Sequence, residues 1–143
     1  MGKKRIIKKS GGADEGAKSR GAVSLAKKRV DEGILYIQAT YNNTIITLAD
    51  AAGNVLAWST AGALGFKGTR KSTPYAASKV AEFIAEQAKI VKMQKVGIIV
   101  KGIGSGRESA IRSFAGKGFD IPYIKDMTPL PHNGPKPSKP RRV

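Results

Sequence analysis

The sequence predicts an α/β fold with a mixed five-stranded sheet, and three observations support it. Apolar and polar residues alternate through residues 34–60, a pattern typical of antiparallel strands. The continuous apolar run at 96–100 indicates a strand buried on both faces and paired in parallel, with helices above and below the sheet. Two further segments repeat apolar residues at helical spacing. The expected order along the chain is β-β-β-α-β-α-β.

The first three strands are expected to form a meander. Residues 34–41 and 44–49 flank Asn42-Asn43, and asparagine tolerates positive φ at both central positions of a hairpin turn. The β-branched residues at 44–47 suit a half-buried sheet. A second turn, D-A-A-G-N at 50–54, leads to a third strand at 55–60. Trp58 in that strand is expected to be a core residue rather than a stacking platform.

Helix signals follow the meander. Thr73 can cap a helix in which Pro74 occupies the first position. The apolar side of this helix is expected to comprise Ala77, Val80, Ala81, Ile84, Ala88 and Val91. A second helix is expected at 108–117, packing through Ile111, Phe114 and Ala115 and ending at Gly116 and Gly118. The last strand, 121–127, contains Pro122, which predicts an edge position.

Positive charge is concentrated at the two ends of a chain whose formal charge is +16. Residues 1–30 carry ten basic and two acidic side chains, and residues 133–143 carry four basic and none acidic. Neither end can bury enough apolar surface to offset an ordering cost of about 1–2 kcal/mol per residue. We therefore expect a basic flexible N-terminal arm (1–32), an α/β domain (33–128) and a Pro/Lys/Arg-rich C-terminal arm (129–143).

Composition argues against several functions. The chain has no cysteine, so disulfides, thiolate metal sites and cysteine nucleophiles are excluded. Its single histidine, His132, lies in a proline-rich segment that would hold neither a metal nor a catalytic base. We expect no catalytic residue, metal, cofactor or small-molecule substrate. No apolar run approaches membrane-spanning length and no secretory signal is apparent, so we expect a soluble, cytoplasmic protein.

Two loops suggest contact with phosphates. In G-I-G-S-G-R at 102–107, glycines let backbone N–H groups approach an anion, the helix start adds its dipole, and Arg107 supplies a bidentate cation. The spacing matches neither a dinucleotide fingerprint nor a P-loop, so nucleic acid is the expected source of phosphate. The loop G-F-K-G-T-R-K-S at 65–72 combines cations, hydroxyls and an aromatic ring. A tight connection for the first loop and an ordinary solvated loop for the second remain alternatives.

Several long motifs, taken in their order along the chain, resemble those of the small-subunit ribosomal protein S11 family over residues 33–143. The motifs are Y-N-N-T at 41–44, G-F-K-G-T-R-K-S-T-P at 65–74, K-G-I-G-S-G-R-E-S at 101–109, T-P-L-P-H-N-G at 128–134 and the final R-R-V. The resemblance implies a three-layer RNase H-like domain in a structural, non-catalytic protein of translation. It also implies rRNA binding at the platform, messenger RNA nearby, and ribosomal proteins S7 and S18 as neighbours. The P-H-N-G motif is similar to the bacterial or organellar type, and a cytoplasmic ribosome is favoured.

The family pattern of the glycine loop has prolines where this chain has Ile103 and Ser105. The loop backbone of this chain is therefore expected to be less rigid before RNA binds. The Asn133-Gly134 dipeptide is a candidate for isoaspartate formation, with intact Asn133 as the alternative. The candidate RNA-binding residues are Lys3, Lys4, Arg5, Lys27, Lys28, Arg29, Asn42, Asn43, Lys67, Arg70, Lys71, Ser72, Gly102, Gly104, Gly106, Arg107, His132, Asn133, Lys136, Lys139, Arg141 and Arg142.

Two other functions are compatible with a basic α/β domain. An RNase H-like nuclease needs carboxylates that converge on metal ions, and the first strand, 34–41, contains no acid. A DNA-bending protein needs exposed apolar wedges, whereas these arms consist mainly of Lys, Arg, Pro and Gly. A metal-dependent hydrolysis assay and a competition between rRNA and duplex DNA would separate them from a structural rRNA-binding protein.

Overall fold

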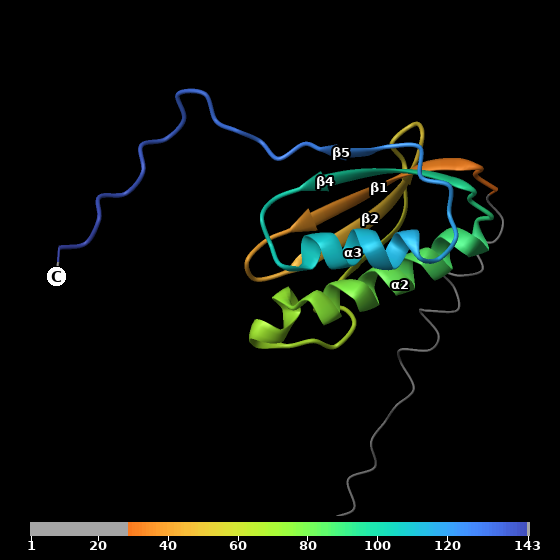
Figure 1. Cartoon of the computed structure of the whole chain (residues 1–143), viewed down its shortest axis with the longest axis horizontal. Coiled ribbons are helices and arrows are strands. Elements are labelled where there is room, and N and C mark those ends of the chain that lie inside the picture. The colour runs from red at the N-terminus through yellow and green to blue at the C-terminus, as the bar shows by residue number, and fades with distance from the viewer. Residues whose placement is uncertain (1–28, 143) are drawn as a thin grey trace, which may run out of the picture.

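The computed structural model describes residues 29–142, which form one mixed sheet and two main helices (Figure 1). The order along the chain confirms the predicted β-β-β-α-β-α-β, with a short 3-10 helix, η1, added before the first helix. The elements are β1 Glu32–Ala39, β2 Thr44–Asp50, β3 Val55–Thr60, η1 Gly68–Ser72, α2 Pro74–Ile90, β4 Lys95–Lys101, α3 Gly106–Ala115 and β5 Ile124–Asp126.

The strands lie in the order β3-β2-β1-β4-β5. β2 pairs antiparallel with β1 and with β3, as the meander requires, whereas β4 pairs in parallel with β1 and with β5. The parallel pairing predicted for 96–100 is therefore confirmed, and β5, which follows Pro122, is an edge strand as expected. As a consequence, the carboxyl ends of β1, β4 and β5 lie at the same edge of the sheet.

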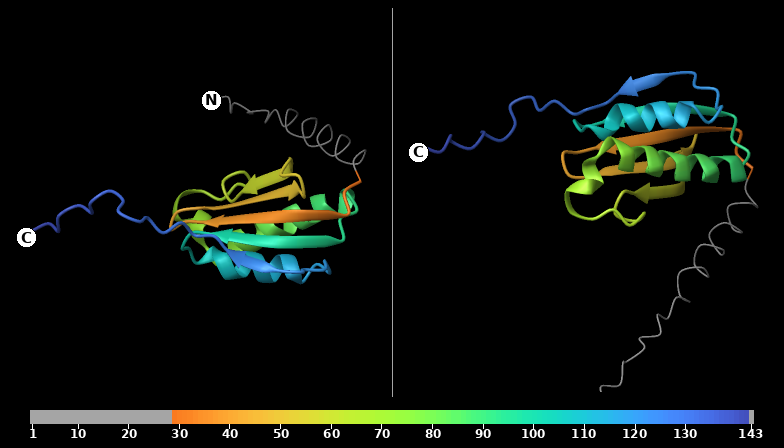
Figure 2. Two further views of the ribbon diagram at one scale, coloured as in Figure 1. Left: turned by 90° about the horizontal axis from the view of Figure 1, so that it is seen from above. Right: turned by 60° about the horizontal axis from the view of Figure 1, so that its bottom comes forward.

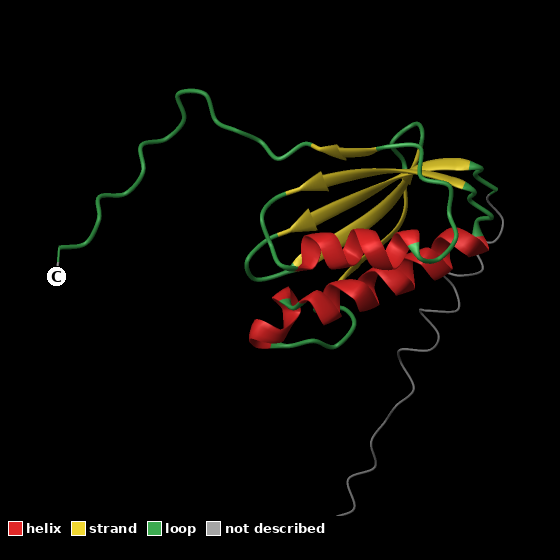
Figure 3. Ribbon diagram, in the orientation of Figure 1, coloured by secondary structure: helices red, strands yellow, loops and turns green. Residues whose placement is uncertain are grey.

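Both helices cover the same face of the sheet, as Figures 2 and 3 show. Leu35 and Ile37 on β1 point into one core shared with both helices, while their neighbours Ile34 and Tyr36 lie half-buried on the opposite face. The described residues thus form two layers rather than the expected three, with no helix of that part on the second face. The core cluster comprises Leu35, Ile37, Ile46, Leu48, Ala61, Ala76, Ala77, Val80, Ala81, Ile84, Ala85, Ala88, Met93, Val96, Ile98, Val100, Ala110 and Phe114.

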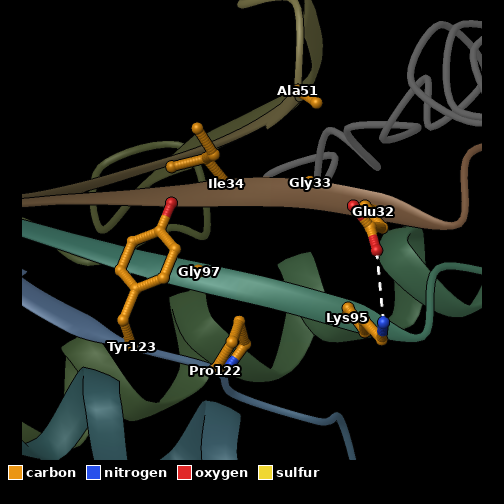
Figure 4. A pocket seen from close by; sticks show the side chains of 8 residues that line it. All are labelled: Glu32, Gly33, Ile34, Ala51, Lys95, Gly97, Pro122 and Tyr123. Carbon is orange, nitrogen blue, oxygen red and sulfur yellow. Dashed lines mark hydrogen bonds and ion pairs between the residues drawn. The ribbon is translucent and has the colours of Figure 1, made fainter.

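Residues 96–100 are buried on both faces even though helices cover only one. On the second face the ring of Tyr123 lies against Gly97, in the place that a side chain there would occupy (Figure 4). Ile99 is paired between Tyr36 on β1 and Lys125 on β5, and both are long enough to shield it. A continuous apolar run therefore indicates burial, but neighbouring side chains can provide that burial without a helix.

The predicted start of α2 is confirmed. The Thr73 hydroxyl accepts a hydrogen bond from the Ala76 N–H (3.3 Å), and Pro74 is the first helical residue. The apolar side expected for this helix is buried throughout. α3 differs from expectation, because it begins at Gly106 rather than 108, and Ala115 is exposed while Ala110 faces the core.

Two local predictions in the meander were wrong. Neither Asn42 nor Asn43 has positive φ. The turn is held instead by Thr40, whose backbone N–H and hydroxyl donate to the Asn43 carbonyl (2.9 and 3.1 Å). Trp58 is not a core residue, since it is 63% exposed on the face without helices.

The close approach of α3 to the sheet and to α2 depends on Gly106. A Cβ added there would lie 2.6 Å from the Thr44 hydroxyl and 2.7 Å from the Ala77 Cβ, both of which are held in the core. Gly116 at the other end of α3 has helical φ and only ordinary contacts at 3.5 Å or more. The glycines at the two ends of α3 therefore differ in what an added methyl group would meet.

We predict that Gly106→Ala destabilises the fold by about 1–3 kcal/mol, the usual cost of overpacking a core. Gly116→Ala is the matched control and should stabilise by about 0.4–1 kcal/mol, because it restricts the unfolded chain without strain. Urea unfolding of both variants tests this. Equal effects of the two substitutions would show that α3 has room to move away from Thr44 and Ala77.

Candidate nucleic-acid interface

The loops that carry the sequence motifs gather at one end of the domain, where β1, β4 and β5 finish and both helices begin (Figure 1). We call this region the loop end and define it as residues 40–43, 67–73, 101–107 and 126–129. The two parallel pairings align the ends of β1, β4 and β5 at one edge of the sheet. β3 is antiparallel to β2, as β2 is to β1, so it ends at the same edge, and the helices that follow β3 and β4 begin there. Segments up to about ninety residues apart in sequence thus share one surface.

The glycine loop lies directly against the β1–β2 hairpin. Gly102 has φ of 91°, and a Cβ there would collide with the Ala39 carbonyl oxygen. A Cβ on Gly104 would lie 2.7 Å from the carbonyl oxygen of Thr40. Glycine is therefore required at both positions, at Gly102 by the backbone conformation as well as by space. This contact places the glycine loop against the turn that leaves β1.

A hydrogen-bond network joins the glycine loop to the residues after β5. The Gly102 N–H donates to the Thr128 hydroxyl (3.1 Å), which in turn donates to the Asp126 carboxylate (2.6 Å). The Thr128 N–H also donates to this carboxylate, at 3.0 Å. Arg107 completes the network by donating to the Gly102 carbonyl (3.2 Å) and to Asp126.

These contacts give Arg107 a second role beside the expected one. The sequence suggested a guanidinium directed only at phosphate, whereas here part of its donor set holds the glycine loop and Asp126 together. Guanidinium has further N–H donors, and the Arg107 side chain remains 31% exposed. It can therefore hold the loop and still present a cation at the surface.

The same network lowers the pKa of Asp126 to about 2, from an ordinary value of 3.8. The Thr128 hydroxyl is the largest cause, followed by the Arg107 guanidinium, since both stabilise the ionised carboxylate. Asp126 is thus an anion at neutral pH that partly neutralises Arg107. The other cations of the loop end are Lys67, Arg70, Lys71 and Lys101.

Ser105 links the glycine loop to the second basic loop. Its hydroxyl donates to the Ser72 carbonyl at 2.7 Å, across 33 residues of sequence. Because this hydroxyl is used there, α3 begins without a side-chain cap. Free N–H groups in the first turn of a helix attract anions. The bond therefore fixes the spacing between η1 and the uncapped start of α3.

The structure brings together ten of the predicted site residues at the loop end: Asn42, Asn43, Lys67, Arg70, Lys71, Ser72, Gly102, Gly104, Gly106 and Arg107. The C-terminal segment extends away from the domain beyond β5 (Figure 1). The predicted site residues in this segment are all exposed, namely His132, Asn133, Lys136, Lys139, Arg141 and Arg142. Arg29 is exposed at the opposite end, before β1. Lys3, Lys4, Arg5, Lys27 and Lys28 lie outside the described residues.

Sequence reasoning missed the residues that organise the loop end, namely Thr40, Ser105, Asp126 and Thr128. Asp-x-Thr is a local signal, because an aspartate often accepts hydrogen bonds from the residue two positions later. No comparable signal marks Ser105, whose partner is distant in sequence. Within residues 29–142, no three His, Cys, Asp or Glu side chains cluster as metal ligands, and no helix is long and apolar enough to cross a membrane.

We predict that Thr128→Val raises the pKa of Asp126 towards its ordinary value more than Arg107→Ala does, because the hydroxyl is the larger cause of the shift. A carboxyl whose folded-state pKa is depressed stabilises the fold above the unfolded value of 3.8, and that contribution is lost as pH falls through about 2. NMR titration of the side-chain carboxyl carbon, over the pH range in which the protein stays folded, measures both variants. A larger rise in the pKa of Asp126 in Arg107→Ala than in Thr128→Val would contradict the larger effect assigned to the Thr128 hydroxyl.

Comparison with protein families agrees with this geometry. A family model described as Ribosomal protein S11 matches residues 33–142, which include the whole sheet except the first residue of β1, both helices and the C-terminal segment almost to its end. All segments of the loop end fall inside the match. Members of this family are non-enzymatic structural proteins of the small ribosomal subunit, with RNA and other ribosomal proteins as partners in translation. The chain belongs to the ribosomal protein S11 family.

Proposed function

We propose that the loop end is the surface through which this protein binds small-subunit rRNA, at the platform of the subunit and close to the path on which messenger RNA leaves. The observation that carries the proposal is the convergence of four loops on one end of the domain. This end combines the exposed cations Lys67, Arg70 and Lys101 with the uncapped start of α3. Cations and helix N-termini are typical phosphate contacts of RNA-binding proteins.

The parts of this surface have different tasks in the proposal. The glycine loop offers backbone N–H groups at a fixed position, because Thr128, Asp126 and Arg107 hold it from one side and Ser72 holds Ser105 from the other. The hairpin residues Asn42 and Asn43 supply amides that can read RNA edges. Fixed loops determine where RNA binds, since groups held in place lose little entropy on binding.

The C-terminal arm, residues 129–143, contributes positive charge to RNA binding, whereas the fixed loops determine where the RNA binds. It carries four cations and no acid from residue 133 onwards. We assign it, together with a basic N-terminal arm at 1–32, to contacts with rRNA around the domain, 33–128. Ribosomal proteins S7 and S18 are the proposed neighbours, and a cytoplasmic ribosome is the proposed location, ahead of an organellar one. These assignments extend the resemblance of the motifs to the S11 family.

Neither rival function is favoured by the geometry. A nuclease would need carboxylates gathered around a metal, whereas the Asp126 carboxylate beside the glycine loop is bonded to Arg107 and Thr128. Membership of a non-enzymatic family agrees with this. A DNA-bending protein would insert apolar side chains between base pairs, and the cations and glycines of the loop end suit phosphate contacts instead.

We predict that positive charge at the loop end contributes more to rRNA binding than positive charge elsewhere on the domain. The triple variant Lys67→Gln, Arg70→Gln, Lys71→Gln removes three cations from this surface. Each phosphate contact contributes about 0.7–0.9 to the slope of log K against log salt, so the slope should fall by about 2. The measurement is the affinity for a small-subunit rRNA fragment over a series of salt concentrations.

The matched control removes three cations from the opposite end of the domain, with Lys89→Gln, Lys92→Gln and Lys117→Gln. Net charge is then identical in the two triple variants, so only position differs. The control should leave the salt slope nearly unchanged. If both variants lower it equally, binding follows net charge alone and the loop end is not the RNA surface.

We also propose that Asn133 is a site of isoaspartate formation. The Gly134 nitrogen attacks the Asn133 side-chain carbonyl carbon and ammonia leaves, and water then opens the succinimide ring mostly to isoaspartate. Asn133 is exposed, with φ of 57°, and follows no regular element that would restrain it. Exposed segments of this kind are the positions where chemical change is tolerated.

Peptide mapping tests this modification in the free chain and in assembled subunits. Incubation of the free chain at neutral pH should accumulate isoaspartate at Asn133, and Gly134→Ala should slow it, because a methyl group hinders attack by the nitrogen. Modification in assembled particles would indicate that it is compatible with RNA contact. An Asn133 that stays intact in both samples would remove the proposal.

A further inference from the structure

The sheet face that neither α2 nor α3 covers presents three aromatic side chains. Trp58 on β3 is 63% exposed, Tyr123 before β5 is 38% exposed, and Tyr36 on the central strand β1 is half-buried. We call this surface the open face. Rings of this size are usually buried, because each carries a large apolar area. Their exposure together on one face of the described residues therefore indicates a surface that binds a ligand.

The strand register puts these rings and a cation into one row. Trp58 is paired with Thr47, Thr47 with Tyr36, Tyr36 with Ile99, and Ile99 with Lys125. Neighbouring strands lie about 4.8 Å apart, so Trp58 and Tyr36 are separated by roughly 10 Å across the sheet. Only the small side chain of Thr47 stands between them.

Tyr123 and Lys125 form the other end of this row. The Lys125 ammonium lies 5.0 Å from the centre of the Tyr123 ring, within the range of a cation–π contact. Beside Tyr123, the side chains of Ile34 and Pro122 line a hollow of about 420 Å³ (Figure 4). The row thus ends in an aromatic ring and a cation, beside a recess that the Lys95–Glu32 ion pair also lines.

The charge of the open face is positive. Its cations are Lys95, Lys101 and Lys125. Its acids are Glu32, which is paired with Lys95 at 3.3 Å, and Asp120, which forms a backbone bridge with Lys95. The buried centre of a protein interface is usually depleted of lysine. Here lysine lies in the same row as the rings. Aromatic side chains on a sheet with flanking cations are instead typical of surfaces that stack unpaired RNA bases.

We infer that the open face is a second RNA contact, on which Trp58 and Tyr36 stack unpaired bases while Lys101 and Lys125 neutralise the adjoining phosphates. The inference rests on the proposed function insofar as both assign RNA as the ligand. It differs in mechanism, because the loop end binds phosphates through cations and backbone N–H groups, whereas the open face binds bases through rings. Lys101, at the end of β4, connects the two surfaces.

Trp58 provides a direct probe, because it is the single tryptophan of the chain. Stacking of a base on its ring should quench its fluorescence. The full chain is titrated with an unlabelled small-subunit rRNA fragment and, separately, with oligouridylate, while binding is followed independently by filter retention. The inference requires quenching that follows the binding curve.

Trp58→Leu keeps an apolar side chain and removes the stacking surface, and it should weaken binding by about 5- to 150-fold, the range that corresponds to the loss of one base–aromatic contact. Val55→Ala is the matched control, since Val55 is 58% exposed on the same strand and carries no ring. It should leave the affinity nearly unchanged. Both positions are exposed, so both variants should keep the thermal midpoint of the wild type.

Binding without quenching, or equal affinities of the two variants, would overturn the inference and leave the loop end as the RNA surface. Quenching or a spectral shift that appears only when another small-subunit protein is added would overturn it in favour of protein docking. If the full chain binds no rRNA fragment, both the inference and the proposed function are wrong. Quenching together with selective loss in Trp58→Leu supports the inference.

Discussion

Parallel pairing of β1 with β4 is the constraint on which the rest of the structure depends. Its register sets Ile37 beside Val100 and Gln38 beside Lys101, so both strands end together. The chain leaving β4 then meets the turn that leaves β1, and only glycine fits at Gly102 and Gly104 against the carbonyls of Ala39 and Thr40. Antiparallel pairing would send the glycine loop to the opposite end of the domain, away from the hairpin. The composite surface is thus a result of sheet topology.

Stability and recognition use different parts of the same sheet. The helix-covered face is built from small and branched residues that let α2 and α3 approach closely, with Gly106 at the tightest point. The open face and the loop end contribute little to that core, and this leaves their side chains available for the RNA contacts that we propose. The glycine loop lacks the two prolines of the family pattern, and the network of Thr128, Asp126 and Arg107 fixes its shape instead.

The sequence predicted the elements well and their assembly less well. Strands, helix caps and the edge position of β5 follow local rules, and Thr73-Pro74 marks the start of α2 correctly. The second helical layer was expected because an apolar run cannot reveal whether helices or a tyrosine over Gly97 bury it. Trp58 was assigned to the core because its exposure depends on which face the helices cover. The bond from Ser105 to Ser72 has no local signal, since partners distant in sequence meet only in the fold.

The most direct measurement of the central claim is a map of the backbone amide NMR shifts that change when a small-subunit rRNA fragment binds to the full chain. The account predicts the largest changes at residues 40–43, 67–73, 101–107 and 126–129, with small changes at 50–54, 91–95 and 116–120. Because amide shifts respond to nearby phosphates and rings, the pattern locates the contact. Changes confined to the opposite end, or to the outer surface of α2, would contradict the assignment of the loop end as the rRNA-binding surface.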